Sequence, residues 1–89
     1  MVNITEVHMS GGTGHEHIEA VKWFNPDNNA VNESTRETMV DWIKNKNGVA
    51  TVKDGKDAVA VGVVDAKTPY IRTHANGKWS DNLLALPRY

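Results

Sequence analysis

One long apolar run most constrains what this chain can fold into. It covers residues 58–64, between Asp57 and Asp65, and consists of seven uncharged residues, four of which are valine. A run of this length suits a strand better than a helix, and β-branched side chains favour the extended backbone. Because the run does not alternate between apolar and polar residues, we expect a central strand that is covered on both faces. Val59, Val61 and Val63 should point to one face and Ala58, Ala60, Gly62 and Val64 to the other, with the small residues placed where other segments pack closely.

Length and composition limit the class of protein. The chain has 89 residues, which predicts a single domain over 1–89. It has no cysteine, which excludes disulfides and Cys-ligated zinc. Its net charge is −1 and its pI is near 6.4, whereas a nucleic-acid-binding domain usually has a pI above about 9. The first residues do not resemble a signal peptide, and no stretch reaches the roughly 18 apolar residues of a membrane span, so we expect a cytoplasmic protein without membrane contact.

The remaining apolar patterns predict four more strands, at 2–9, 17–24, 49–53 and 70–74. In the first of them the apolar parity changes between Ile4 and Val7, which indicates a bulge or a shorter strand. The glycine-rich stretch near 10–16 is expected to be a flexible loop.

One helix is predicted at 35–46. Ser34 and Glu37 fit a capping box at its start, and Asn47-Gly48 would end it. Its apolar face would be formed by Met39, Val40, Trp42 and Ile43. Trp42 is therefore expected to be a core residue, as is Trp23 in the second strand.

The predicted order of elements is β-β-α-β-β-β. Asp54-Gly55 favours a tight hairpin, and a two-residue loop there would pair Val52 with Asp57 and Lys53 with Lys56. A longer loop would separate the two lysines. The order predicts an α+β domain with a mostly antiparallel sheet and one helix packed on a face.

The C-terminal stretch 79–87 contains Trp79 and three leucines, and it is expected to form a lid over one end of the sheet. Pro87 disfavours a helix at the residue before it, so at most a short turn is expected at 81–85.

The last third of the chain has a recognisable pattern. Tyr70-Ile71-Arg72-Thr73 is followed by Asn76-Gly77, then by Asp81-Asn82-Leu83-Leu84-Ala85-Leu86-Pro87. This resembles the ending of DUF3892, a small bacterial and phage family of unknown function, in which a Tyr-hydrophobic-Arg-Ser/Thr segment precedes a polar turn, an Asn-Leu pair and Leu-Pro. The resemblance extends over about 17–87, although Ala75-Asn76 stands where the family more often has an aspartate. It implies a fold and a bacterial or phage source, and it implies no activity.

Metal binding and catalysis have weak support in the sequence. His15 and His17 have the only metal-like spacing and would share a strand face; with His8 or His74 they could hold Zn²⁺. We favour a polar loop rim instead. The glycines at 11–14 lack the lysine and the following helix of a phosphate loop. Because no set of residues combines catalytic roles, we expect neither an enzyme nor a cofactor.

Three polar residues near the C-terminus, Arg72, Asp81 and Asn82, have two interpretations. In the structural one, which we favour, Arg72 pairs with Asp81 and Asn82 bonds the backbone, which latches the chain over the sheet. In the functional one, Tyr70, Arg72 and Asn82 form a recognition patch for an anionic or peptide partner.

The sequence therefore favours a non-catalytic binding or interaction module. Its partner would be a protein or peptide, or a second copy that pairs through a free sheet edge. The alternative is a nucleic-acid accessory protein, because Tyr70 and Arg72 share a strand face and six aromatic residues could supply stacking surfaces. Against this alternative, the basic residues are scattered along the chain. A small metal-dependent enzyme is the third possibility.

Overall fold

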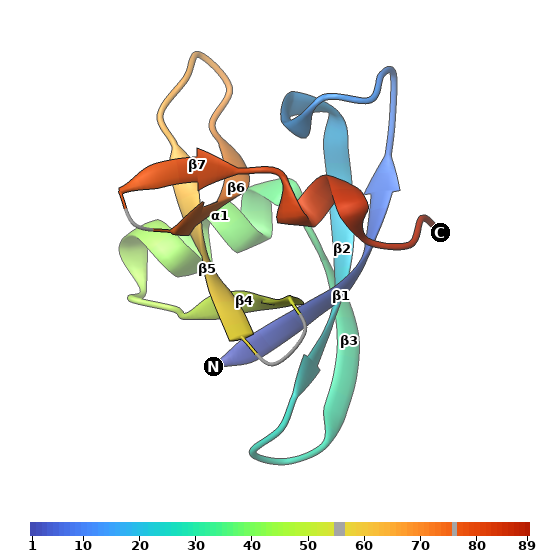
Figure 1. Ribbon diagram of the computed structural model, residues 1–89, viewed down its shortest axis with the longest axis vertical. Helices are drawn as coiled ribbons and strands as arrows, with labels where there is room; N and C mark the ends of the chain where they lie inside the picture. The colour runs from blue at the N-terminus through green and yellow to red at the C-terminus, as the bar shows by residue number, and fades with distance from the viewer. Residues whose placement is uncertain (55–56, 76) are drawn as a thin grey trace.

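The computed structural model describes residues 1–54, 57–75 and 77–89, and it contains one sheet, one α-helix and two short 3₁₀ helices within them (Figure 1). The strands are β1 (Val2–Met9), β2 (Ile18–Asn25), β3 (Ala30–Thr35), β4 (Ala50–Asp54), β5 (Asp57–Val64), β6 (Tyr70–Ala75) and β7 (Lys78–Ser80). The helix is α1 (Arg36–Asn45), and the 3₁₀ helices are η1 (His15–His17) and η2 (Asn82–Ala85). None of these helices is long and apolar enough to cross a membrane.

The seven strands form one sheet in the order β3-β2-β1-β4-β5-β6-β7. All neighbours are antiparallel except β1 and β4, which are parallel. The chain is thus an α+β domain with a mostly antiparallel sheet, as the sequence predicts. β1 and β4 pair only at Val2 and Asn3, and then they diverge. Beyond this split, the backbone of Val7 bonds residues 87–89: its N–H donates to Pro87 O, and its carbonyl accepts from Tyr89 N–H.

The core lies on one face of the sheet, called here the inner face. Met39 of α1 and Leu83 of η2 join the buried strand side chains there. η2 contacts β1, β4 and β6, so it lies at the split between β1 and β4. The buried strand residues of the core are Val2, Ile4, Val7, Ile18, Val21, Ala50, Val52, Val61 and Ile71.

Two strands, β3 and β7, are missing from the predicted order. β3 is an edge strand whose residues are mostly exposed and polar, so its sequence lacks the alternation that identifies a half-buried strand. β7 has only three residues and forms the other edge. The predicted bulge in β1 is confirmed by a register shift between Ile4 and Glu6.

The start of α1 differs from the predicted capping box. Thr35 is the N-cap, and its side chain accepts a hydrogen bond from Thr38 N–H at 3.3 Å. Ser34 belongs to β3, and its hydroxyl accepts from Trp23 Nε1 at 3.0 Å, so it cannot serve as the cap. The predicted end is confirmed, because Asn47 adopts a left-handed backbone with φ 56°.

The predicted hairpin register is wrong by two residues. Val52 lies opposite Val59, and Asp54 lies opposite Asp57. This register pairs two apolar side chains on the inner face, whereas the predicted one would place the Asp57 carboxylate beside buried Val52. The predicted pair of Lys53 with Lys56 falls partly on residues 55–56, which lie outside the described residues.

β5 is a central strand, but it is covered on both faces only near Gly62. Val61 is buried on the inner face, as predicted, while Ala58 and Ala60 are exposed on the opposite, outer face. Gly62 is covered there by Trp79, whose ring would lie 3.3 Å from a Cβ added to the glycine. Trp79 therefore does not join the C-terminal leucines, of which Leu83 is fully buried in the core.

Candidate functional site

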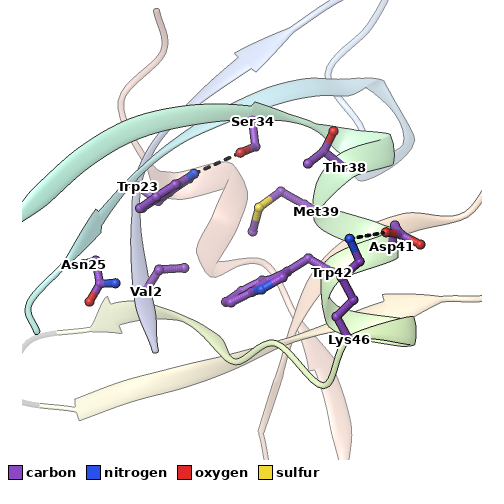
Figure 2. Close-up of a pocket in the computed structure, with 9 residues that line it drawn as sticks. All are labelled: Val2, Trp23, Asn25, Ser34, Thr38, Met39, Asp41, Trp42 and Lys46. Carbon is purple, nitrogen blue, oxygen red and sulfur yellow. Dashed lines mark hydrogen bonds and ion pairs between the residues drawn. The ribbon is translucent and has the colours of Figure 1, made fainter.

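A cavity of about 360 Å³ lies between α1 and strands β1 to β3 (Figure 2). Trp23 of β2 and Trp42 of α1 approach it from different sides, and the side chains of Met39 and Val2 lie between them. The described residues that line it are Val2, Trp23, Asn25, Ser34, Thr38, Met39, Asp41, Trp42 and Lys46.

Both indole rings of the cavity are fixed by the surrounding backbone and side chains. Trp23 is held by its hydrogen bond to Ser34. Trp42 packs directly on the backbone of Gly48, because a Cβ at that glycine would lie 2.1–2.4 Å from three atoms of the ring. Gly48 also donates its N–H to the carbonyl of Trp42 at 2.9 Å, so the end of the helix positions the ring. The walls are therefore preformed.

The charged residues of the cavity, Asp41 and Lys46, are at its rim. Their side chains are 52% and 68% exposed, and they form an ion pair of 3.6 Å (Figure 2). Asn45 donates to the Asp41 carboxylate at 2.8 Å, and this hydrogen bond holds the pKa of Asp41 below its usual value, with a smaller contribution from Lys46. The cavity can thus receive an apolar group, and the described residues that line it include no buried acid or base.

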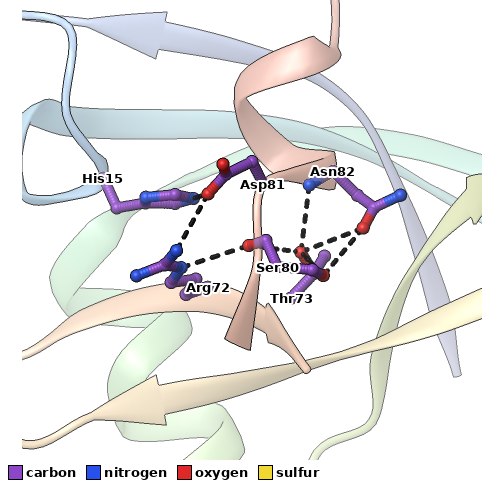
Figure 3. Close-up of polar contacts among 6 residues, drawn as sticks. All are labelled: His15, Arg72, Thr73, Ser80, Asp81 and Asn82. Carbon is purple, nitrogen blue, oxygen red and sulfur yellow. Dashed lines mark hydrogen bonds and ion pairs between the residues drawn. The ribbon is translucent and has the colours of Figure 1, made fainter. Parts of the chain in front are cut away.

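A second cluster of polar side chains joins β6 to the start of η2 (Figure 3). Arg72 donates from Nε to Ser80 O at 3.1 Å and from Nη2 to Asp81 Oδ1 at 2.9 Å. Thr73 accepts from Asn82 N–H at 3.1 Å, and Ser80 Oγ lies 2.8 Å from both Thr73 Oγ1 and Asn82 Oδ1. These bonds tie the C-terminal segment to β6.

His15 lies next to this cluster. It is 6% exposed, and its Nε2 lies 3.8 Å from Asp81 Oδ1 without a hydrogen-bond partner among the described residues (Figure 3). Burial lowers the pKa of His15, and the charge of Arg72 lowers it further, while Asp81 and Glu16 act in the opposite direction. The imidazole therefore prefers its neutral form in the folded protein.

The structure brings some of the singled-out polar residues together and separates others. Arg72 and Asp81 are in contact, and Tyr70 shares the outer face of β6 with Arg72. Asn82 instead contacts Thr73 and Ser80, and Thr73 is buried on the inner face. The three residues of the predicted recognition patch therefore do not lie on one face of the sheet.

The histidine arrangement predicted for metal binding is not present. His15 and His17 lie in a 3₁₀ helix and not on a strand, so they do not share a face: His15 points to Asp81, while His17 lies 3.6 Å from Glu16. No group of three His, Cys, Asp or Glu side chains could hold a metal ion within residues 1–54, 57–75 and 77–89.

The cavity itself was not predictable from the sequence. Met39 and Trp42 have the spacing of a core-facing helix, and that spacing is the same whether the face packs against the sheet or leaves a space. A glycine six residues after Trp42 is the only local signal, and it is also explained by the end of the helix.

A family model described as "Protein of unknown function (DUF3892)" matches residues 3–87, which is nearly the whole chain. Comparison with curated proteins gives no significant match, and comparison with solved structures gives none either.

Proposed function

The chain belongs to the DUF3892 family, and we propose that this member is a non-catalytic interaction module that binds a protein or peptide partner. The observation that supports this proposal is the cavity between α1 and the sheet, with two tryptophan rings in its walls. An apolar side chain of the partner would enter it as an anchor.

The size of the cavity suits such an anchor. A cavity of about 150 Å³ is enough for benzene in an engineered protein, and ligand sites start at about 300 Å³. At about 360 Å³, the cavity has room for a ring-sized or branched apolar side chain. Interface hot spots are typically of this kind, since a large side chain in a desolvated pocket contributes most of the binding energy.

The position of the charged side chains at the cavity also supports a role in binding a partner and not a role in catalysis. Asp41 and Lys46 are at the rim, where they remain solvated and could contact polar groups beside the anchor. The inner part of the lining consists of Trp23, Met39, Trp42 and Val2, none of which can transfer a proton at neutral pH.

The proposal can be tested with blocked pentapeptides, Ac-Gly-Gly-X-Gly-Gly-NH₂, in which X is Trp, Leu or Asp. We expect the Trp and Leu peptides to shift the NMR signals of the Met39 methyl group and of the Trp23 and Trp42 indoles, and the Asp peptide to leave them unchanged. Thr38→Trp should abolish the shifts, because residue 38 lines the cavity and a larger side chain would fill it. Glu37→Trp is the matched control, since Glu37 is exposed and does not line the cavity. Equal shifts with all three peptides, or none with any, would contradict the proposal.

Self-association through β3 is a second candidate mode of interaction. β3 is a six-residue edge strand, and Val31 within it is 70% exposed. The strand contains neither lysine nor proline, which commonly prevent edge pairing. A dimer should be detected by analytical ultracentrifugation and should dissociate in Val31→Lys; a monomer at ~1 mM protein removes this mode.

A further inference from the structure

The outer face of β4 to β7 carries a set of side chains that the cavity does not use. Residues directly paired across an antiparallel sheet lie on one face, and every second residue of a strand returns to that face. The pairs Lys53–Ala58, Ala60–His74, Gly62–Arg72 and His74–Trp79 therefore share the face opposite the core. We call this set, together with Tyr70, the outer platform.

An exposed aromatic pair stands at one side of the outer platform. Trp79 is 44% exposed, and its ring meets the ring of His74 edge-on with centroids 5.3 Å apart. The indole packs on the backbone of Gly62, because the glycine has no side chain and so leaves room for the ring. Ala58 and Ala60, in the same strand as Gly62, are exposed and small, so they leave an accessible surface beside the ring. An indole held in this way can stack on a planar group.

The charges of the outer platform are of one sign. Its described positions on the four strands contain Lys53 and Arg72, along with His74, and no carboxylate. Asp57, at the start of β5, is at a position of the strand that faces the inner side of the sheet. The Arg72 charge is paired with the Asp81 carboxylate, whereas exposed Lys53 forms no ion pair with any side chain that the structure describes, so Lys53 is the cation that we assign to a phosphate. Lys53 and Trp79 are three strands and two residues apart, about 16 Å at the usual spacings of a sheet.

From this face we infer that the outer platform binds single-stranded nucleic acid, with bases stacking on Trp79 and a phosphate near Lys53. Both parts are needed: an exposed indole provides stacking that tolerates any base, and the exposed Lys53 ammonium attracts the phosphate backbone. Double-stranded DNA fits the platform poorly, because its bases are already stacked on one another. The platform lies on the face opposite α1 and the cavity, so the inference does not depend on the proposed function.

The test uses the full chain with fluorescein-labelled oligo-dT and oligo-U of twelve nucleotides at ~20 mM salt, followed by fluorescence polarisation. We expect the oligonucleotides to bind, to quench the tryptophan fluorescence of the protein, and to lose affinity steeply as the salt concentration rises. Trp79→Ala should weaken binding about tenfold, within the range of one lost stacking contact. Lys53→Glu should weaken it and reduce the salt dependence. Lys78→Glu is the matched control, because it makes the same charge change at an exposed residue of opposite parity, so it should weaken binding clearly less than Lys53→Glu does.

Several results would overturn the inference: no binding at ~100 μM protein, equal binding of a twelve-base-pair duplex, or equal loss in Lys78→Glu and Lys53→Glu. If Trp79→Ala lowers the melting temperature, His74→Ala replaces it, because His74 is exposed and contributes the other ring. Thr38→Trp, which fills the cavity on the other face, should bind the oligonucleotides as the parent does.

Discussion

Because Trp42 packs on the backbone of Gly48, we expect a methyl group added at residue 48 to destabilise the fold. In Gly48→Ala the new Cβ would fall 2.1–2.4 Å from three ring atoms of Trp42, so the ring or the backbone must move. We expect a loss of about 1–3 kcal/mol in the free energy of unfolding, as for other overpacked sites. Denaturant titration followed by circular dichroism measures it.

Gly77→Ala is the control for that substitution. Gly77 has φ 76° and no atom within 4 Å of an added Cβ, so only the backbone conformation is penalised, by about 1 kcal/mol. If Gly48→Ala costs no more than Gly77→Ala, Trp42 is free to move, and the cavity is not preformed.

Buried His15 predicts a loss of stability in mild acid. Its pKa in the folded protein is lowered from 6.5 by burial and by Arg72, so the unfolded chain binds the proton more tightly. The neutral imidazole's contribution to stability is therefore fully present above pH 6.5 and is lost as the pH falls from 6.5 through the folded pKa. Unfolding experiments between pH 8 and pH 5 should show this slope, and His15→Gln should reduce it. His74→Gln, at an exposed position, should retain the slope; a parent-like slope in His15→Gln would refute the assignment.

The Arg72 contacts decide between a stabilising latch and a free binding residue. Arg72→Ala removes hydrogen bonds to Ser80 O and Asp81, and because the side chain is 30% exposed we expect a loss of about 1 kcal/mol. Lys44→Ala, which breaks the more exposed pair with Asp65, should cost about 0–0.5 kcal/mol. An unchanged melting temperature in Arg72→Ala would leave the recognition role as the better interpretation.

At the scale of elements, the two candidate caps of α1 give separable predictions. Thr35→Ala should cost about 1 kcal/mol and shorten the helix, because Thr35 caps the N–H of Thr38. Ser34→Ala should leave the helical signal unchanged and shift the Trp23 indole N–H resonance, since it removes that group's acceptor. A helix weakened by Ser34→Ala alone would restore the capping box expected from the sequence.

The elements show which structural information was present in the sequence. β5 was predictable from its uninterrupted run of apolar, largely β-branched residues, and α1 was predictable from the 3.6-residue period of its apolar face. β3 was missed because an edge strand in solvent tolerates polar residues at every position. The hairpin register depended on the pairing of Val52 with Val59, which turn chemistry alone does not specify. The pairing of Arg72 with Asp81 could be proposed from the sequence, whereas the approach of His15 depends on the fold of the distant η1 segment.

At the scale of the whole molecule, η2 joins the two parts of the sheet. Leu83 is fully buried at the split between β1 and β4. Leu83→Ala should therefore cost about 2–5 kcal/mol, as truncations of buried leucine do. Leu84→Ala, at a half-buried position of the same turn, should cost clearly less. Equal costs would mean that η2 only covers the surface; differential scanning calorimetry compares the two.

The pairing of β1 also has a consequence for the order of events during synthesis. β1 is synthesised before the other strands of this sheet, yet its partner at Val2 is Ala50, and the backbone partners of Val7 are Pro87 and Tyr89. Contacts that close such long loops form late, because the chain entropy is lost before the bonds are made. The hairpin of β1 with β2 can form early, but the other edge of β1 stays unpaired at Val7 until residues 87–89 have been synthesised. We expect nascent chains that stop before residue 87 to be the ones that chaperones retain.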